Sequence, residues 1–312
     1  MKHKAKGKMP TARLTAQNQS AIKTAHEFVR HVRHIGGRAP DRRYLDDGWH
    51  APVLLPYLVL VVGSPVALCA TLDVQEIIRK SVTVNEVDWK AAPEYSFTER
   101  DHGRNGTKTY EVTMIEGSPY QRLIAVNGKT LSAQGYNEEE RKLQHTLTAR
   151  QTESKGQRDE RIAKYESDRK QDHLLMGQLT VAFDFKLVSE MRMDKHEVYL
   201  LRASPRKGYR PPNMESQVLR GMQGQLWIDK KTFQWVKVTA RVISPVSIEG
   251  FLAEVEPGTY FELERMPVAE GIWLPKHFAM KSRSKIFYLI GHNTQDDETY
   301  LDYRKIEPIK NH

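Results

Sequence analysis

The sequence predicts an α+β protein that is mainly β, with a single large curved antiparallel sheet covered by helices. Apolar and polar residues alternate in many short runs, and turn residues separate these runs every 8–14 residues or so, which is typical of hairpin-linked strands. A sheet with one apolar face needs cover from helices, a second sheet or a ligand. Helix-forming segments lie before the first strand and in mid-chain, so we expect them to cover one curved sheet of about 10–11 strands.

The first elements of the folded region are a helix and several hairpins. A short amphipathic helix is expected from Leu72, because apolar residues then recur at helical spacing. Strand alternation begins at Tyr95. Asn105-Gly106 and Asn127-Gly128 are typical of tight hairpin turns, and Gly117-Ser118-Pro119 marks another turn between them.

Residues 136–176 interrupt the strand pattern with a charged helical insertion. They are dense in Glu, Arg, Lys and Gln, which favour helices, and Gly156 is expected to mark a bend between two of them. The mixture of signs predicts a solvated surface.

Strands return after Thr180. Residues 204–213 are expected to form a Pro-rich loop, and the carboxylates at 296–298 a loop before the last strand. Trp227 and Trp235 alternate with the apolar strand residues and are expected to face away from the main apolar face, or to lie at a strand end under the insertion. The expected strands cover residues 182–190, 197–203, 225–229, 235–242, 260–266, 272–280, 286–290 and 300–306.

The basic charge of the chain is concentrated at its N-terminal end. Residues 1–50 carry 11 of the 48 Lys and Arg but 4 of the 39 Asp and Glu, and residues 51–70 carry no charge. We expect residues 1–50 to be a disordered polar extension. The predicted folded domain, 71–312, therefore has a net charge of +2 out of +9, which argues against nucleic-acid binding.

Residues 51–70 predict an export signal. The apolar run 53–62 has the length of a signal-peptide core, small residues follow it, and the basic residues upstream favour translocation of the C-terminal part. The alternatives are cleavage after Ala70, lipidation of Cys69 and retention as a signal anchor in the inner membrane. We expect an exported protein in the periplasm or at the outer envelope, which contacts the membrane through this segment alone.

Four motifs of the folded region belong together. They are a helix after an export signal, IEGSPYQRLI before Asn127-Gly128-Lys129, GQLWID at 224–229, and GIWLP at 271–275 leading to YLDYRK at 300–305. Together they resemble the LolA/LolB-like superfamily of outer-membrane lipoprotein-sorting proteins, and more closely its uncharacterised exported bacterial members. The similarity covers about residues 72–308 and implies an incomplete antiparallel β-barrel, a half-barrel whose open side is lidded by helices and whose cavity holds acyl chains.

The resemblance implies that apolar strand residues on the covered face line such a cavity, although each of them can equally be ordinary core. The candidate ligand-binding residues are Val112, Ile124, Leu226, Ile228, Val236, Val238, Phe261 and Leu263.

Motifs for catalysis and for cofactors are missing from the sequence. G-x-S-x-G, P-loop and G-x-G-x-x-G patterns are absent, so Ser118 is interpreted as a turn residue. One cysteine and scattered histidines suggest no metal site. We therefore expect a non-catalytic envelope protein without a cofactor that binds a lipid or a lipidated protein. The alternative is an envelope scaffold with a solid core that binds a protein partner.

Overall fold

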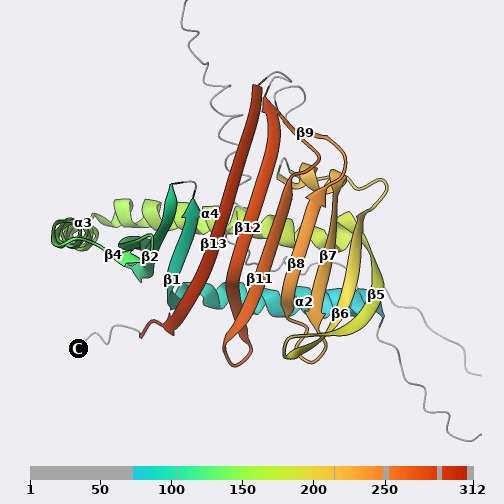
Figure 1. The fold of residues 1–312 in the computed structure, drawn as a ribbon, viewed down its shortest axis with the longest axis horizontal. Helices are drawn as coiled ribbons and strands as arrows, with labels where there is room; N and C mark the ends of the chain where they lie inside the picture. The colour runs from blue at the N-terminus through green and yellow to red at the C-terminus, as the bar shows by residue number, and fades with distance from the viewer. Residues whose placement is uncertain (1–72, 104, 214, 249–252, 287–289, 308–312) are drawn as a thin grey trace, which may run out of the picture.

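The computed structural model describes residues 73–307 except 104, 214, 249–252 and 287–289. Its centre is one antiparallel sheet of 13 strands, which does not close, with β4 and β5 at its two edges (Figure 1). The predicted fold class is confirmed. The strand order is β4-β3-β2-β1-β13-β12-β11-β8-β7-β6-β5, with β10 paired to β12 and β9 paired to β10.

The strands match the predicted alternation closely. The three shortest, β4, β9 and β10, account for the excess over the expected number, because two or three residues are too few to show a period. The bounds are β1 Tyr95–Gly103, β2 Gly106–Ile115, β3 Ser118–Val126, β4 Lys129–Thr130, β5 Phe183–Met193, β6 His196–Pro205, β7 Met222–Asp229, β8 Trp235–Val242, β9 Val246–Ile248, β10 Ala253–Val255, β11 Tyr260–Ala269, β12 Ile272–Ile286 and β13 Ile290–Lys305.

The predicted tight turns connect the predicted hairpins. Asn127 and Gly128 both have positive φ, 53° and 74°, as a two-residue type I′ turn between β3 and β4 requires. Gly106 opens β2 at φ 107°, and β1 pairs with β2 up to this position.

The last two strands differ from the prediction. The carboxylates at 296–298 lie inside β13 and not in a loop, because β13 pairs with β12 over the whole run and with β1 from Glu298 onward. These two ladders outweigh the low strand propensity of Asp and Glu. Residues 287–289 of the expected strand 286–290 lie outside the described residues, and its ends, Ile286 and Ile290, are the last residue of β12 and the first of β13.

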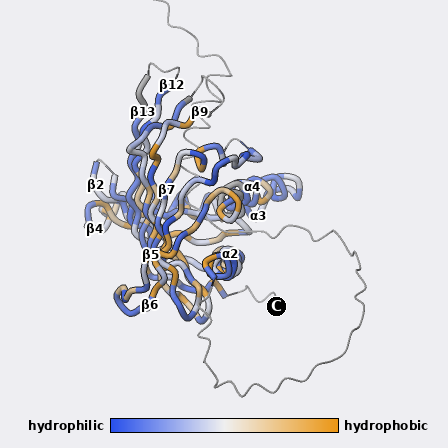
Figure 2. The backbone as a smooth tube through the Cα atoms, turned by 90° about the vertical axis from the view of Figure 1, so that its right-hand side faces the viewer, coloured by the Kyte–Doolittle hydropathy of each residue, from blue (hydrophilic) through white to orange (hydrophobic). Residues whose placement is uncertain are grey.

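Three α-helices lie on one side of the sheet (Figure 2). They are α2 Val74–Ala91, α3 Ala133–Thr152 and α4 Lys155–Ala182, accompanied by the 3₁₀ helices η2 Ala92–Glu94 and η3 Glu215–Gly221. The helix expected after Leu72 is thus confirmed as α2, and α2 and α4 both run across the strands (Figure 1).

The helical insertion is confirmed, but its bend is not at Gly156. The two helices meet at Glu153 and Ser154, because the Ser154 side chain accepts from Gln157 N while the Gln157 side chain accepts from Ser154 N. This capping box starts α4 at Lys155 and includes Gly156 in its first turn.

Two arginines of the helical insertion form hydrogen bonds with the turn between β2 and β3 and so hold the insertion against the sheet. Arg150 Nη1 donates to the carbonyl oxygens of Ile115 and Ser118, both at 2.8 Å. Arg161 Nη1 donates to Ser118 Oγ at 2.7 Å and its Nη2 to the Glu116 carbonyl at 3.0 Å. Ser118 is buried and its hydroxyl accepts this bond, which fits a structural residue at the start of β3.

Residues 1–72 lie outside the described part of the chain. The expected extension at 1–50, the export signal at 51–70 and the fate of Cys69 therefore stay predictions. None of the helices among the described residues is long and apolar enough to cross a membrane.

Candidate functional site

A strongly apolar recess lies between the β5–β8 side of the sheet, the end of α4, and η3. Its volume is about 90 Å³. Strand side chains form one wall, including Phe183, Ala203 and Leu226, and the other wall contains Leu179 of α4 and Val218 of η3. Because four of its apolar side chains are half-buried, the recess is not sealed; they are Leu179, Phe185, Ala240 and Phe261.

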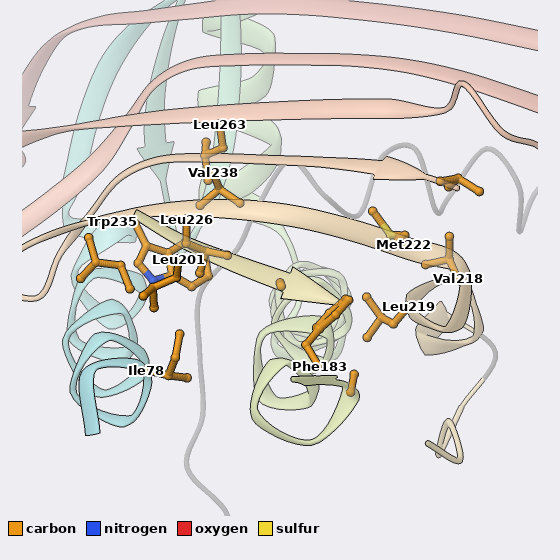
Figure 3. Packing of buried hydrophobic residues seen from close by; sticks show 14 of the residues in the cluster. Ile78, Phe183, Leu201, Val218, Leu219, Met222, Leu226, Trp235, Val238 and Leu263 are labelled. Atoms are coloured by element: carbon orange, nitrogen blue, oxygen red, sulfur yellow. The ribbon is translucent and has the colours of Figure 1, made fainter. Parts of the chain in front are cut away.

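The recess continues into the main hydrophobic core. Figure 3 shows Leu201, Leu226 and Trp235 on the strands facing Ile78 of α2, with Val218 and Leu219 of η3 farther along the same face. Ile78, Leu201 and Val218 are each at most 2% exposed. One end of the covered face is therefore filled by α2, while the end under η3 keeps free volume.

The structure brings together three of the eight predicted cavity residues. Leu226, Val238 and Phe261 line the recess. Ile228 and Leu263 belong to the same core cluster but are packed away from the recess.

The other three predicted residues lie elsewhere. Val112 lines a second cavity, described below. Ile124 is 37% exposed on β3, near the sheet edge. Val236 packs with Val198 and Trp273 in a separate cluster.

A β-bulge explains the position of Val236. Ile228 pairs with Trp235, but its neighbour Trp227 pairs with Lys237, so Val236 is the extra residue on β8. The bulge brings Trp235 and Val238 to the same face, within the main core, and moves Val236 to the other face. The expectation that Trp235 faces away from the core is therefore wrong, whereas Trp227 does pack on the Val236 side.

Residues that strand periodicity could not identify complete the recess. Leu179 lies in the part of α4 beyond the predicted insertion, Val218 and Leu219 lie in η3 after the predicted Pro-rich loop, and Met222 is the first residue of β7. The spacing of these last three residues, i, i+1 and i+4, is a helical signal in the sequence.

A buried polar cluster fixes α2 against β11 and β12. Arg265 Nη2 lies 3.0 Å from Asp88 Oδ2, with side-chain exposures of 6% and 0%. Asp88 Oδ1 accepts from Trp273 N at 2.8 Å and from Gln234 Nε2 at 3.2 Å, and Asn85 accepts from Arg265. Burial raises the pKa of the Asp88 carboxyl, and the Arg265 charge and the hydrogen bonds oppose this rise.

A second contact joins α4 to α2. His173 Nε2 lies 2.9 Å from a Glu86 carboxylate oxygen, and the His173 ring packs on Trp89 with centroids 5.4 Å apart. Burial lowers the pKa of His173, against the attraction of Glu86. This contact fixes the middle of α4 but leaves its C-terminal end, at Leu179, to pack on the apolar recess.

The second cavity lies toward the β1–β3 side of the sheet and measures about 380 Å³. Its walls come from α2, α4, β1–β3 and β11–β13, and they differ in chemistry from the first recess. Seven of the twenty lining residues are aromatic, and the charged lining residues are Asp88, Glu99, Arg169 and Arg265.

The described residues show no metal centre, since no three His, Cys, Asp or Glu side chains among them are grouped so as to hold an ion. The site as a whole can enclose apolar groups between the sheet and the helices.

Comparison with known proteins finds no matching family model and no matching curated protein. Three solved structures are similar over most of their length. A DUF1329 family protein from Desulfovibrio piger has 12% identity and a TM-score of 0.29, covering 74% of this chain and 92% of the other.

The other two structures are described as a lipoprotein-sorting protein and a LolA superfamily protein, the group that the sequence motifs resemble. A putative outer membrane lipoprotein-sorting protein domain from Vibrio parahaemolyticus has 10% identity and a TM-score of 0.27, covering 75% of this chain and 95% of the other. The LolA superfamily protein NE2245 from Nitrosomonas europaea has 12% identity and a TM-score of 0.28, covering 75% and 94%. Because these superpositions are partial, what this chain binds must be inferred from its own residues and geometry.

Proposed function

We propose that this protein is a non-catalytic carrier that binds an apolar chain, such as the acyl chain of a lipid or a lipidated protein, between its sheet and its helices. The observation that carries the proposal is the recess under η3 and the end of α4. Its lining is apolar apart from Thr239, Thr259 and Tyr260, and it is partly open. Such a site favours hydrocarbon, because its accessible lining is almost entirely apolar and a polar group placed there gives up its hydrogen bonds to water.

The volume of the recess limits how many methylene groups of a ligand it can hold before any helix moves. A water molecule occupies roughly 30 Å³ in the liquid, so 90 Å³ accommodates about three groups of that size. At about 0.8 kcal/mol per buried methylene, three methylenes contribute roughly 2.4 kcal/mol. A longer chain requires η3 and the end of α4 to move away from the sheet, and we propose that these two elements act as the lid.

The test is uptake of palmitate by the full chain, measured by isothermal titration. Ala203 lies on β6 in the recess wall and is 3% exposed. Ala203→Leu fills the recess and is expected to weaken palmitate binding about 50-fold, the equivalent of the lost 2.4 kcal/mol. Ala279→Leu makes the same change on β12 between the inward-facing Phe278 and Met280, hence on the opposite face, and should bind as the wild type does.

No palmitate uptake by the wild type, or equal affinity in the wild type and Ala203→Leu, would overturn the proposal. Circular dichroism of both variants establishes that they are folded. A folded wild type without uptake would favour the scaffold that binds a protein partner.

We also propose that residues 51–70 direct export of this carrier to the periplasm or the outer envelope. The support is the uncharged apolar run that follows a basic segment. Fractionation of an exporting host, with N-terminal sequencing of the mature chain, tests this. A mature protein that begins after Ala70 in the periplasmic fraction is expected, and an intact chain in the cytosol would refute export.

A further inference from the structure

The second cavity has the size of a ligand site and a chemistry of its own. At about 380 Å³ it falls in the range of small-molecule pockets, which starts near 300 Å³. None of its lining residues is shared with the apolar recess. The two spaces lie under opposite halves of the sheet, since one is built on β5–β8 and the other on β1–β3 and β13.

Seven of its twenty lining residues are aromatic, and they come from distant parts of the chain. Phe97 of β1 packs on Tyr300 and Tyr303 of β13, with ring centroids 5.8 and 5.3 Å apart, and Tyr120 and Tyr165 line the cavity from β3 and α4. Rings with quadrupolar faces and edges bind other flat π-systems in stacked or edge-to-face arrangements. A planar aromatic ligand therefore suits this cavity better than a saturated chain does.

The α4 wall adds hydrogen-bond donors. The Arg169 side chain is 8% exposed, and its guanidinium carbon lies 3.9 Å from the centre of the Trp89 ring. Arg169 donates to the Trp89 carbonyl at 2.6 Å and to Glu166 at 3.0 Å, which uses two of its five N–H donors. The Trp89 indole N–H is buried and has no hydrogen-bond partner among the described residues.

The two arginines of the lining each have a carboxylate partner, and Arg169 keeps three N–H donors beyond those given to Glu166 and Trp89. Asp88 is paired with Arg265, and Glu99 lies on the opposite wall, on β1, where it accepts from Gln121 at 3.4 Å. A buried donor without a partner is costly, so an acceptor on a ligand is favoured near Trp89 and Arg169.

We propose that this cavity binds a planar aromatic anion, with its rings among the aromatic side chains and its anionic group at Arg169 and the Trp89 indole N–H. The proposal does not depend on uptake of an acyl chain by the other recess.

The test compares two fluorescent probes that differ by one charged group: 1-anilinonaphthalene-8-sulfonate and its uncharged parent, N-phenyl-1-naphthylamine. The wild-type full chain is expected to bind both at a saturable site. Arg169→Met keeps the bulk of the side chain over Trp89 and removes its charge. It should weaken binding of the sulfonate about tenfold and change binding of the parent less than twofold.

Two further variants locate the site and keep the test independent of any folding defect in Arg169→Met. Val112→Phe reduces the cavity from the β2 wall and should weaken both probes. Ala203→Leu fills the other recess and should change neither. The proposal is overturned if the wild type binds neither probe, if Arg169→Met affects both probes equally, or if Ala203→Leu rather than Val112→Phe displaces them.

Discussion

The buried ion pair between Asp88 and Arg265 provides the sharpest stability prediction. The two residues are 177 positions apart, and their contact holds α2 to β11 with almost no solvent access. Asp88→Asn removes one charge and leaves the Arg265 guanidinium buried with neutral partners. Removing one partner of a buried pair costs about 3–5 kcal/mol, because the other charge stays desolvated and uncompensated.

The expected loss of stability corresponds to a large decrease in Tm for a domain of this size. A domain of 150–250 residues loses about 2–4 °C of Tm per kcal/mol, so Asp88→Asn should lower Tm by about 6–20 °C. Urea unfolding followed by far-UV circular dichroism measures the same loss as a lower midpoint at unchanged slope.

The double variant separates the ion pair from simple loss of packing. Asp88→Asn combined with Arg265→Met removes both charges, so it should cost less than the sum of the two single variants by 1–3 kcal/mol or so. Lys164→Met is the control, because its partner Asp168 and its own side chain are 54% and 75% exposed, and it should cost less than about 0.5 kcal/mol. Additive single losses, or an Asp88→Asn variant as stable as the control, would refute the reasoning.

Three other predictions concern the turns and helices. Gly221→Ala should lower the free energy of unfolding in urea by about 2 kcal/mol, since a Cβ there would lie 2.6 Å from the Ser244 carbonyl oxygen. In the matched variant Gly177→Ala in α4, the new Cβ meets nothing within 4 Å and should stabilise the helix. Equal effects of the two variants would contradict this. Burial acts to raise the pKa of Asp229, but hydrogen bonds from the turn that follows and from a histidine outweigh it and lower that pKa. The stabilisation that the ionised Asp229 contributes is therefore present above the unfolded pKa of about 3.9 and is lost as pH falls through the lower folded pKa. The wild type should be more stable than Asp229→Ala by about 2 kcal/mol at pH 7, and this difference should narrow below pH 4. A difference that does not change with pH would refute the argument. Arg150→Met removes the hydrogen bonds to the β2–β3 turn and should speed amide hydrogen exchange in α3, and unchanged exchange would show that the insertion is held by other contacts.

The sequence predicted residues of the apolar recess correctly where the alternation of side chains along a strand is enough to tell which face of the sheet they lie on. Leu226, Val238 and Phe261 line the recess as their alternation indicates, because each lies on an uninterrupted part of its strand. Val236 could not be placed in this way, since the bulge depends on the register between β7 and β8. Ile124 could not be placed either, since it is the extra residue of a second bulge: Thr109 pairs with Ala125 but Tyr110 pairs with Leu123, and Ile124 is 37% exposed.

The sequence by itself determined the local elements of this protein. The Asn-Gly turns, the strand periods, the helix after Leu72 and the charged insertion all follow from interactions within a few residues of each other. The tertiary structure alone decided that an acidic run lies inside β13, that Asp88 meets Arg265, and that Arg169 closes over Trp89. Arg169 and Trp89 are 80 residues apart in the sequence, and Asp88 and Arg265 are 177 residues apart. Their free energy comes from burial and pairing between elements, which no local pattern records.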